Sequence, residues 1–342
     1  MNYRPIIKEL VPLGTPWATI DPFLFCVHHR DAYPAGDGHG GPSSSLAGRN
    51  LGNDFADVDG WNMYHGSAVP GFPQHPHRGF ETLTYVRQGL VDHADSLGAS
   101  ARYGEGDAQW MTAGSGIVHS EMFPLLDESG GNQLELFQIW INLAAADKMV
   151  EPHFSMLWAN DIPVIDIADE KGRATRVTLV AGAVDGHVLP DAPPDSWAAK
   201  PESDVAVWHV VLDAGASWAM PLANHGDTQR MVYLFEGDSV SVGGEQIRGY
   251  TGALIRCDEE FDVVADGGPV EMLVLQGRPI GEPVERYGPF VMNTRAEIQE
   301  AFDDYRTTAF GGWPWPDDGP VHGQLGDRFV KRPDKPVEVG SA

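Results

Sequence analysis

HPHRGFETLTYVRQG, residues 75–89, is the stretch of sequence that decides the fold. His75 and His77 are two residues apart, so on a strand both imidazole rings point to the same face. Residues 80–91 are rich in β-branched and aromatic side chains, which predicts a strand that turns at Gln88-Gly89. The stretch therefore predicts a β protein in which one strand presents two candidate metal ligands together.

A second pair of candidate ligands, His119 and Glu121, has the same spacing. It closes the segment GDAQWMTAGSGIVHSE at 106–121, which we expect to form short extended pieces broken by glycines. The 42 residues from His77 to His119 are enough for a few antiparallel strands that bring both pairs together. Three imidazoles and one carboxylate suit iron, manganese, nickel, copper or zinc, and leave positions open for water or substrate. The alternative is a polar barrel mouth that binds no metal.

A weak internal repeat indicates that the β domain is duplicated. Residues 81–89 and 229–237 each combine a polar residue, a β-rich run and a turn glycine eight residues later. Only one possible ligand survives in the second copy, which predicts a second barrel without metal. In that copy the places of His75, His77 and Glu81 are taken by Ala223, His225 and Gln229.

The rest of the chain reads as many short strands joined by turns, in keeping with its 40 glycines and 26 prolines. One helix is predicted at about 294–310, because Thr294 and Glu297 form a capping box ahead of apolar residues at helical spacing. A polar tail follows from about 313. Further strands are predicted within 134–143, 174–182, 205–220, 229–244 and 270–279, and long loops within 36–60 and 183–204.

The length of the chain limits the number of domains, and its charge limits the kinds of partner. The 342 residues are enough for two domains, which we place at 1–165, with the metal site, and at 166–342, with the helix and the tail. The 49 acidic residues outweigh the 23 basic ones, for a formal charge of −26. Because this charge repels phosphate backbones, no nucleic-acid partner is expected, whereas neutral small ligands and basic proteins are favoured.

The sequence also predicts where in the cell the protein is located. The first residues, MNYRPIIKELVPLG, lack the apolar core of a signal peptide, and no segment approaches the length of a membrane span. Cys26 and Cys257 lie far apart, which favours two buried thiols over a disulfide. We therefore expect a cytoplasmic protein that does not engage a membrane.

Three segments together resemble the pirin family of the cupin superfamily: HPHRGFETLTY at 75–85, GDAQWMTAGSGIVHSE at 106–121 and GRPIGEPVERYGPFVMNT at 277–294. The resemblance covers residues 65–165 and 176–312. It implies an all-β fold of two tandem cupin barrels, each a double-stranded β-helix or jelly roll, with a short C-terminal helix. The loop at 36–60 is longer than the N-terminal region usual in pirins, which would reshape the entrance of the site.

The resemblance also implies a ligand set. In pirins the positions of His75, His77, His119 and Glu121 bind a single iron, so one divalent metal per chain is expected, Fe(II) first and Mn, Ni, Cu, Co or Zn otherwise. The general cupin pattern would instead take its carboxylate from Glu81. Similarity to pirins in particular implies Glu121 as the ligand and leaves Glu81 as a residue behind the ligands.

The function implied by the resemblance is that of a quercetin 2,3-dioxygenase, which opens a flavonol-like ring with O2 and releases carbon monoxide. Glu121 or Glu81 would then take the proton of the flavonol hydroxyl. Trp110, Met111 and Phe123 would line an apolar pocket, or alternatively belong to the core. The other function found among pirins is a non-enzymatic, iron-binding, redox-sensing regulator that acts by binding a protein partner.

Overall fold

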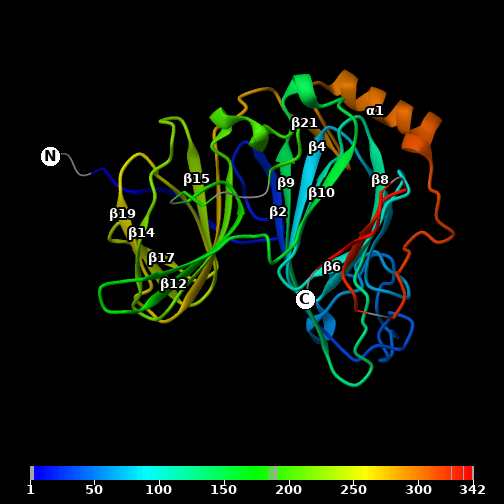
Figure 1. The fold of residues 1–342 in the computed structure, drawn as a ribbon, viewed down its shortest axis with the longest axis horizontal. Helices are drawn as coiled ribbons and strands as arrows, with labels where there is room; N and C mark the ends of the chain where they lie inside the picture. Colours follow the sequence, from blue (N-terminus) through cyan, green and yellow to red (C-terminus); the bar gives the residue numbers. More distant parts are fainter. Residues whose placement is uncertain (1–3, 185, 188–190, 325, 334, 341–342) are drawn as a thin grey trace. The chain divides into compact units, whose positions relative to one another are not determined.

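The computed structural model of this chain describes residues 4–184, 186–187, 191–324, 326–333 and 335–340. Within these residues it consists mainly of β-strands, with one α-helix near the C-terminus (Figure 1). The strands form four larger sheets and one two-stranded sheet. This architecture confirms the all-β fold with a short C-terminal helix.

The chain divides into two compact units, each assembled from separated segments. It passes from one unit to the other inside two strands, β2 (Phe23–Tyr33) and β9 (Asn132–Asn142). We call one the histidine unit, which comprises His28–Gln138, Leu143–Ala159 and Glu282–Ala342. The other, the apolar unit, comprises Met1–Val27, Ile139–Asn142 and Asn160–Gly281.

Two sheets enclose the core of the histidine unit. A five-stranded sheet has the order β10-β7-β4-β9-β2, and a six-stranded sheet has the order β24-β23-β6-β5-β8-β3. Figure 1 shows β4, β9 and β10 running alongside one another. The core draws Val86 and Met111 from the first sheet and Val91 and Ile117 from the second. The bounds are β3 (Gly71–His77), β4 (Phe80–Gln88), β5 (Leu90–Asp95), β6 (Ser100–Gly104), β7 (Ala108–Thr112), β8 (Ile117–Met122), β10 (His153–Leu157), β23 (Phe329–Lys331) and β24 (Glu338–Val339).

The apolar unit repeats this plan with a different core. Its sheets have the orders β1-β18-β15-β20-β13-β12-β11 and β14-β19-β16-β17. Val210 and Val232 from the first sheet join Val242 and Val263 from the second in one apolar cluster. The bounds are β1 (Ile7–Pro12), β11 (Val164–Ala168), β12 (Ala174–Ala181), β13 (Ala206–Leu212), β14 (Ser217–Met220), β15 (Gln229–Glu236), β16 (Ser239–Val242), β17 (Glu245–Arg248), β18 (Thr251–Ile255), β19 (Phe261–Val264) and β20 (Val270–Gly277).

The predicted strand at 80–91 is a hairpin in the structure. Strand β4 ends at Gln88, and β5 begins at Leu90 after Gly89, whose φ of 80° suits a glycine. The predicted strand at 134–143 is confirmed as β9. The loops predicted at 36–60 and 183–204 contain, of regular elements, only single helical turns at η1 (Val58–Gly60), η3 (Trp197–Ala199) and η4 (Pro201–Ser203) within the described residues.

The helix forms where the capping box predicted it. Helix α1 (Arg295–Thr308) begins after Thr294, whose hydroxyl accepts the Glu297 N–H at 3.3 Å. Its apolar face packs on the two-stranded sheet of β21 (Glu285–Tyr287) and β22 (Phe290–Met292). Two short turns, η2 (Ala145–Asp147) and η5 (Ala309–Gly311), complete the histidine unit, and η5 directly follows the helix.

The compact units differ from the division at residues 165 and 166 expected from the sequence, because each end of the chain pairs with the more distant half. Near the N-terminus, β1 forms an antiparallel ladder with β18 of the apolar unit. Near the C-terminus, β23 pairs with β6 of the histidine unit, so the tail adds strands to a sheet and does not merely lie on the surface. Residues 4–27 therefore group with the later barrel, and 282–340 with the earlier one.

The structure also tests the predictions about membrane spans and about the two cysteines. In the part of the chain that the structure describes, no helix is long and apolar enough to cross a membrane. Cys26 and Cys257 are both buried thiols, as predicted. Burial raises the pKa of each thiol above its ordinary value, which keeps both protonated and unreactive.

Candidate metal centre

The antiparallel pairing of β3 with β8 brings the two predicted ligand pairs together. His75 and His119 are direct cross-strand partners, and His77 lies two residues further along β3 on the same face. The ring centroids are 4.4 Å apart for His75 and His119, and 5.0 Å apart for His77 and His119. One ligand atom from each of the three rings lies within 4.8 Å of the others. The three imidazoles therefore converge on one point.

Backbone carbonyls fix the protonation of two of these rings. Nδ1 of His75 lies 2.9 Å from the carbonyl oxygen of Pro73, and Nδ1 of His77 lies 3.4 Å from that of Pro289. A carbonyl can only accept, so Nδ1 carries the proton and Nε2 carries the lone pair in each neutral ring. Such outer hydrogen bonds orient imidazoles that bind metals.

Burial holds the three imidazoles in the form that binds a cation. Removal from water lowers the pKa of His75, although the carbonyl of Pro73 and the charge of Glu121 oppose this shift. Burial and the neighbouring rings lower the pKa of His77 and His119 well below the ordinary value. Neutral imidazoles with available lone pairs are the state that metal binding requires.

Glu121 lies on the same face of β8 as His119 but just outside the group of three. Its Oε1 accepts the Thr84 hydroxyl at 3.1 Å, and its Oε2 accepts the Gln138 side-chain N–H at 2.6 Å. The Tyr103 hydroxyl lies beside Thr84 and Glu121, and burial together with the Glu121 charge raises the pKa of Tyr103 well above its ordinary value. The carboxylate is thus held by donors from two strands at the edge of the imidazole group.

Glu81 does not join this group. The ladder between β4 and β7 is regular from Glu81 to Tyr85, so Glu81 and Thr84 point to opposite faces of β4. Glu81 is fully buried and accepts the Thr112 hydroxyl at 2.7 Å. Thr84 faces the site, because it contacts Glu121, and Glu81 therefore faces away from it. The expectation that Glu81 supports the metal ligands is wrong.

Two residues that the sequence analysis did not single out lie beside the imidazole group. His93 and Asp95 are on β5, where they pair across the ladder with Glu121 and His119. The rings of His93 and His119 are 5.6 Å apart, and Nε2 of His93 lies 3.2 Å from Oδ2 of Asp95. The signal was the same period-2 spacing as in the ligand pairs, within the segment VDHAD at 91–95.

The donor set fits a transition metal. Both ring nitrogens of His119 are buried and have no hydrogen-bond partner within the described residues. A buried polar atom without a partner is costly, and a metal ion would satisfy one of these nitrogens. His75, His77 and Glu121 could supply the remaining nitrogen and oxygen donors, a set that suits iron and its neighbours in the first transition series.

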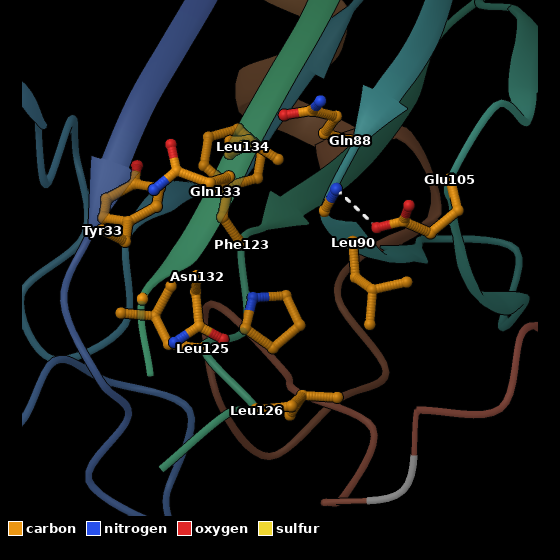
Figure 2. Close-up of a pocket in the computed structure, with 13 residues that line it drawn as sticks. Tyr33, Gln88, Leu90, Glu105, Phe123, Leu125, Leu126, Asn132, Gln133 and Leu134 are labelled. Atoms are coloured by element: carbon orange, nitrogen blue, oxygen red, sulfur yellow. Dashed lines mark hydrogen bonds between the residues drawn. The ribbon is translucent and has the colours of Figure 1, made fainter. Parts of the chain in front are cut away.

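A cavity of about 310 Å³ lies elsewhere in the histidine unit. Figure 2 shows Tyr33, Phe123 and Leu134 on its wall, and Glu105 accepting the N–H of Gly89. None of the three histidines lines it, but Phe123 follows Glu121 by two residues. The cavity therefore reaches the chain just after β8, while the candidate chemistry belongs to the imidazole group.

The other aromatic and apolar residues predicted near the site divide between two faces. Met111 belongs to the core of the histidine unit, and Phe123 belongs to both the core and the cavity wall. Trp110 pairs with Leu83 across the ladder, on the face of the sheet that carries Glu81. Of the three, only Phe123 belongs to the wall of this cavity.

Two family models match parts of this chain. A family model described as Pirin matches residues 48–141, and one described as Pirin C-terminal cupin domain matches residues 207–311. The first match contains all the candidate ligands. The tail beyond residue 311 and the first 47 residues lie outside both matches.

Two relatives match most of the chain. A protein of Pseudomonas aeruginosa named "Putative quercetin 2,3-dioxygenase" is 41% identical over 240 residues, which cover 70% of this chain and 79% of the relative. A "Pirin-like protein" of Caulobacter vibrioides is 36% identical over 273 residues, which cover 79% and 90%. Among solved structures, a quercetin 2,3-dioxygenase from Acinetobacter baumannii aligns with a TM-score of 0.67 at 30% identity, covering 85% of this chain and 87% of that one.

Proposed function

This chain belongs to the pirin family, and on that premise we propose that its histidine unit holds one metal ion and acts as a quercetin 2,3-dioxygenase-type enzyme. One observation carries the proposal. The buried imidazoles of His75, His77 and His119 bring one donor atom each within 4.8 Å of one another, beside a carboxylate. Three neutral imidazoles and one carboxylate as ligands leave coordination positions for a substrate and a small gas.

The proposed ligands are His75, His77, His119 and Glu121, and the proposed ion is iron(II), with manganese, nickel, copper, cobalt and zinc as other candidates. Such an ion, when bound, supplies a Lewis acid for a phenolic hydroxyl and a centre for electron exchange with O2. The relative of P. aeruginosa and the A. baumannii structure, which are similar to most of this chain, support the quercetin 2,3-dioxygenase reaction through their names.

Glu121 is the residue that we assign to proton transfer. Its two oxygens allow one to bind the ion while the other accepts the proton of a flavonol hydroxyl. Thr84 and Gln138 donate to these oxygens and hold the carboxylate in place. Glu81 has no part in the proposal, because it lies on the other face of β4. Overall, both oxygen atoms of O2 enter the ring-opened product, and one carbon leaves as carbon monoxide.

The surroundings of His75 favour an aromatic substrate. Phe72 lies 6.4 Å from His75 and 6.1 Å from Phe123, between ring centroids. Aromatic rings at these distances pack with one another and with flat ligands. We place the activity in the cytoplasm, where buried thiols such as Cys26 and Cys257 remain reduced, and we assign it no nucleic-acid or membrane partner.

The test begins without air. Quercetin added to the iron-loaded protein under anaerobic conditions should shift its absorption band, and prior removal of the metal should abolish the shift. Admission of O2 should then consume the flavonol and release carbon monoxide, at a rate that falls steeply in Glu121→Gln. This variant keeps the size of the side chain but removes its negative charge and its basicity.

The alternative is the iron-binding regulator. A metal-loaded, folded protein that neither shifts nor consumes any flavonol in a broad panel would overturn the dioxygenase proposal. A stable complex with a protein partner that depends on the oxidation state of the iron would then support the regulator. The formal charge of −26 directs that search toward basic partners.

A further inference from the structure

Three buried ring nitrogens near the site have no hydrogen-bond partner within the described part of the chain. They are Nδ1 and Nε2 of His119 and Nδ1 of His93. Both side chains are fully buried, so water does not reach these atoms. Buried polar atoms are nearly always satisfied in folded proteins, and three together in adjacent rings require an explanation.

The ladder between β5 and β8 places the two rings side by side. Asp95 pairs with His119, and His93 pairs with the neighbouring position Glu121. The centroids of the His93 and His119 rings are 5.6 Å apart, and no hydrogen bond joins the two rings in this geometry. A small shift of either ring would bring their edge nitrogens to hydrogen-bond distance. The ring of Phe154 also packs against His93, with 5.3 Å between ring centroids.

Asp95 determines which nitrogen of His93 carries the proton. Its Oδ1 accepts the N–H groups of Leu97 and Ala99, both at 2.9 Å, which anchors the carboxylate in the turn after β5. Its Oδ2 lies 3.2 Å from Nε2 of His93. A carboxylate accepts, so Nε2 of His93 donates, and Nδ1 of a neutral His93 carries a lone pair.

The three unsatisfied nitrogens can then be accounted for together. A metal ion bound by His119 takes the lone pair of one ring nitrogen and leaves a proton on the other. That N–H needs an acceptor, and Nδ1 of His93 is a buried acceptor that needs a donor. One ion and one hydrogen bond between the two rings therefore satisfy all three atoms.

We infer that Asp95, His93 and His119 form a chain of hydrogen bonds next to the metal, which we call the relay. In the relay, Asp95 orients His93, and His93 accepts the ring N–H of His119. The inference rests on the proposed metal site and adds two positioning residues to it. The relay makes the His119 nitrogen that faces the ion more electron-rich and fixes the orientation of the ring. It thus strengthens metal binding through a residue that does not itself bind the ion.

The first test uses two substitutions of His93 in the full-length protein, with Co²⁺ as the probe. His93→Leu removes the acceptor and should weaken Co²⁺ binding by roughly 10- to 100-fold, with a change in the visible absorption of the bound Co²⁺. His93→Asn places an amide oxygen close to the position of Nδ1 and should restore most of the affinity. The matched control is His153→Asn on β10, an exposed histidine of the same unit, which should bind Co²⁺ like the wild type.

The second test keeps the volume constant. In Asp95→Asn the amide oxygen can still accept from Leu97 and Ala99, while the amide nitrogen donates to Nε2 of His93. The proton of His93 then moves to Nδ1, so two donors face each other between His93 and His119. We expect a loss of Co²⁺ affinity similar to that of His93→Leu, in a protein whose circular dichroism is unchanged.

The outcomes distinguish a failure of the relay from a failure of the proposed metal site. If the wild type binds one Co²⁺ and both His93→Leu and Asp95→Asn bind it equally well, the relay is excluded while the metal site stands. If the wild type binds no Co²⁺, the metal site fails and the relay fails with it. If His93→Leu does not fold, Asp95→Asn and His93→Asn still decide the question.

Discussion

The two units share one strand plan and both have an apolar core, yet some equivalent inward positions are polar in one unit and apolar in the other. Strand β4 of the histidine unit and β15 of the apolar unit are both central in their sheets, and each ends before a turn glycine with positive φ, Gly89 and Gly237. In this alignment Thr84, which donates to Glu121, corresponds to Val232 in the apolar cluster. The repeat seen in the sequence is therefore a structural repeat whose inward positions have diverged.

A second pair of strands extends the correspondence. Nε2 of His28 lies 2.8 Å from a carboxylate oxygen of Glu135 in the histidine unit, and His209 and Glu271 repeat this contact at 2.9 Å in the apolar unit. Counting from these matched contacts gives two further equivalences. Gln138, the other donor to Glu121, corresponds to Val274, and the buried Asp31 corresponds to Leu212.

The positions around Thr84 differ most clearly in chemistry. In the apolar unit the equivalent Val232 lies in a cluster of residues whose burial alone is favourable, although the polar side chain of Arg230 is buried beside it. In the histidine unit Thr84 instead donates to the buried carboxylate of Glu121. Violations of the rules of stable cores are typical of functional sites. This difference between the units therefore points to the candidate metal centre.

The largest expected effect is loss of the metal when a ligand of the histidine unit is removed. His119→Ala or Glu121→Ala should lower metal affinity by more than the roughly 10- to 100-fold expected for an outer partner. Both proteins should remain folded, because burial of apolar residues stabilises the barrel. Elemental analysis should give one metal per wild-type chain and none in these variants.

The matched control for that prediction is His225→Ala in the apolar unit, the one histidine that occupies a ligand position of the repeat. It should leave the metal content unchanged. Two tightly bound ions per wild-type chain, or loss of metal in His225→Ala, would contradict the difference between the units.

The next effect concerns pH. Burial raises the pKa of Asp31 to about 6 from 3.8, although Tyr64 and Asn62 donate hydrogen bonds to it. The unfolded chain therefore ionises first as pH rises from 4 to 6, and the contribution of Asp31 to the free energy of unfolding falls in this window. At 1.36 kcal/mol per pH unit the loss is at most roughly 3 kcal/mol.

Asp31→Asn removes this titration. The free energy of unfolding of the wild type minus that of Asp31→Asn, measured in urea at pH 4 and at pH 7, should be lower at pH 7. The constant cost of the amide cancels in this double difference. An equal difference at both values of pH would show that Asp31 ionises alike in the folded and unfolded chains.

The smallest effect comes from exchanging equivalent residues between the units. Val232→Thr places a hydroxyl in the apolar cluster and should lower the free energy of unfolding by about 1–3 kcal/mol. Thr84→Val makes the opposite change and removes a donor to Glu121, so it should weaken Co²⁺ binding by about tenfold. Urea unfolding and Co²⁺ titration measure the two changes, and a Thr84→Val protein with wild-type affinity would show that Thr84 does not hold the ligand.

Much of the site could be predicted from the sequence because alternation along a single strand is a local property. The pairs His75 with His77 and His119 with Glu121 each keep period 2 without a break, so each pair had to share a face. The same holds for the capping box that starts α1. The likeness to pirins added which pairs meet, and the comparisons bear out the family.

The assignment of Glu81 failed for a physical reason. Counting from His77 to Glu81 assumes one continuous strand, but the chain leaves β3 at His77 and enters β4 at Phe80 through Gly79, whose φ is 85°. A residue in the left-handed region turns the chain and resets which face an even or odd position occupies. The sequence could not reveal this reset, since glycine is compatible with either backbone conformation.

By itself the sequence determined many of the strands, the helix cap, and the shared face of His75 with His77 and of His119 with Glu121, because these depend on neighbours within a few residues. Only the tertiary structure decided that β1 and β23 pair with the distant halves of the chain, that Glu81 lies away from the site, and that His93 lies beside His119. These features depend on the register between strands that are far apart in the chain. Register is set by which faces are buried together, a property of the assembled barrel.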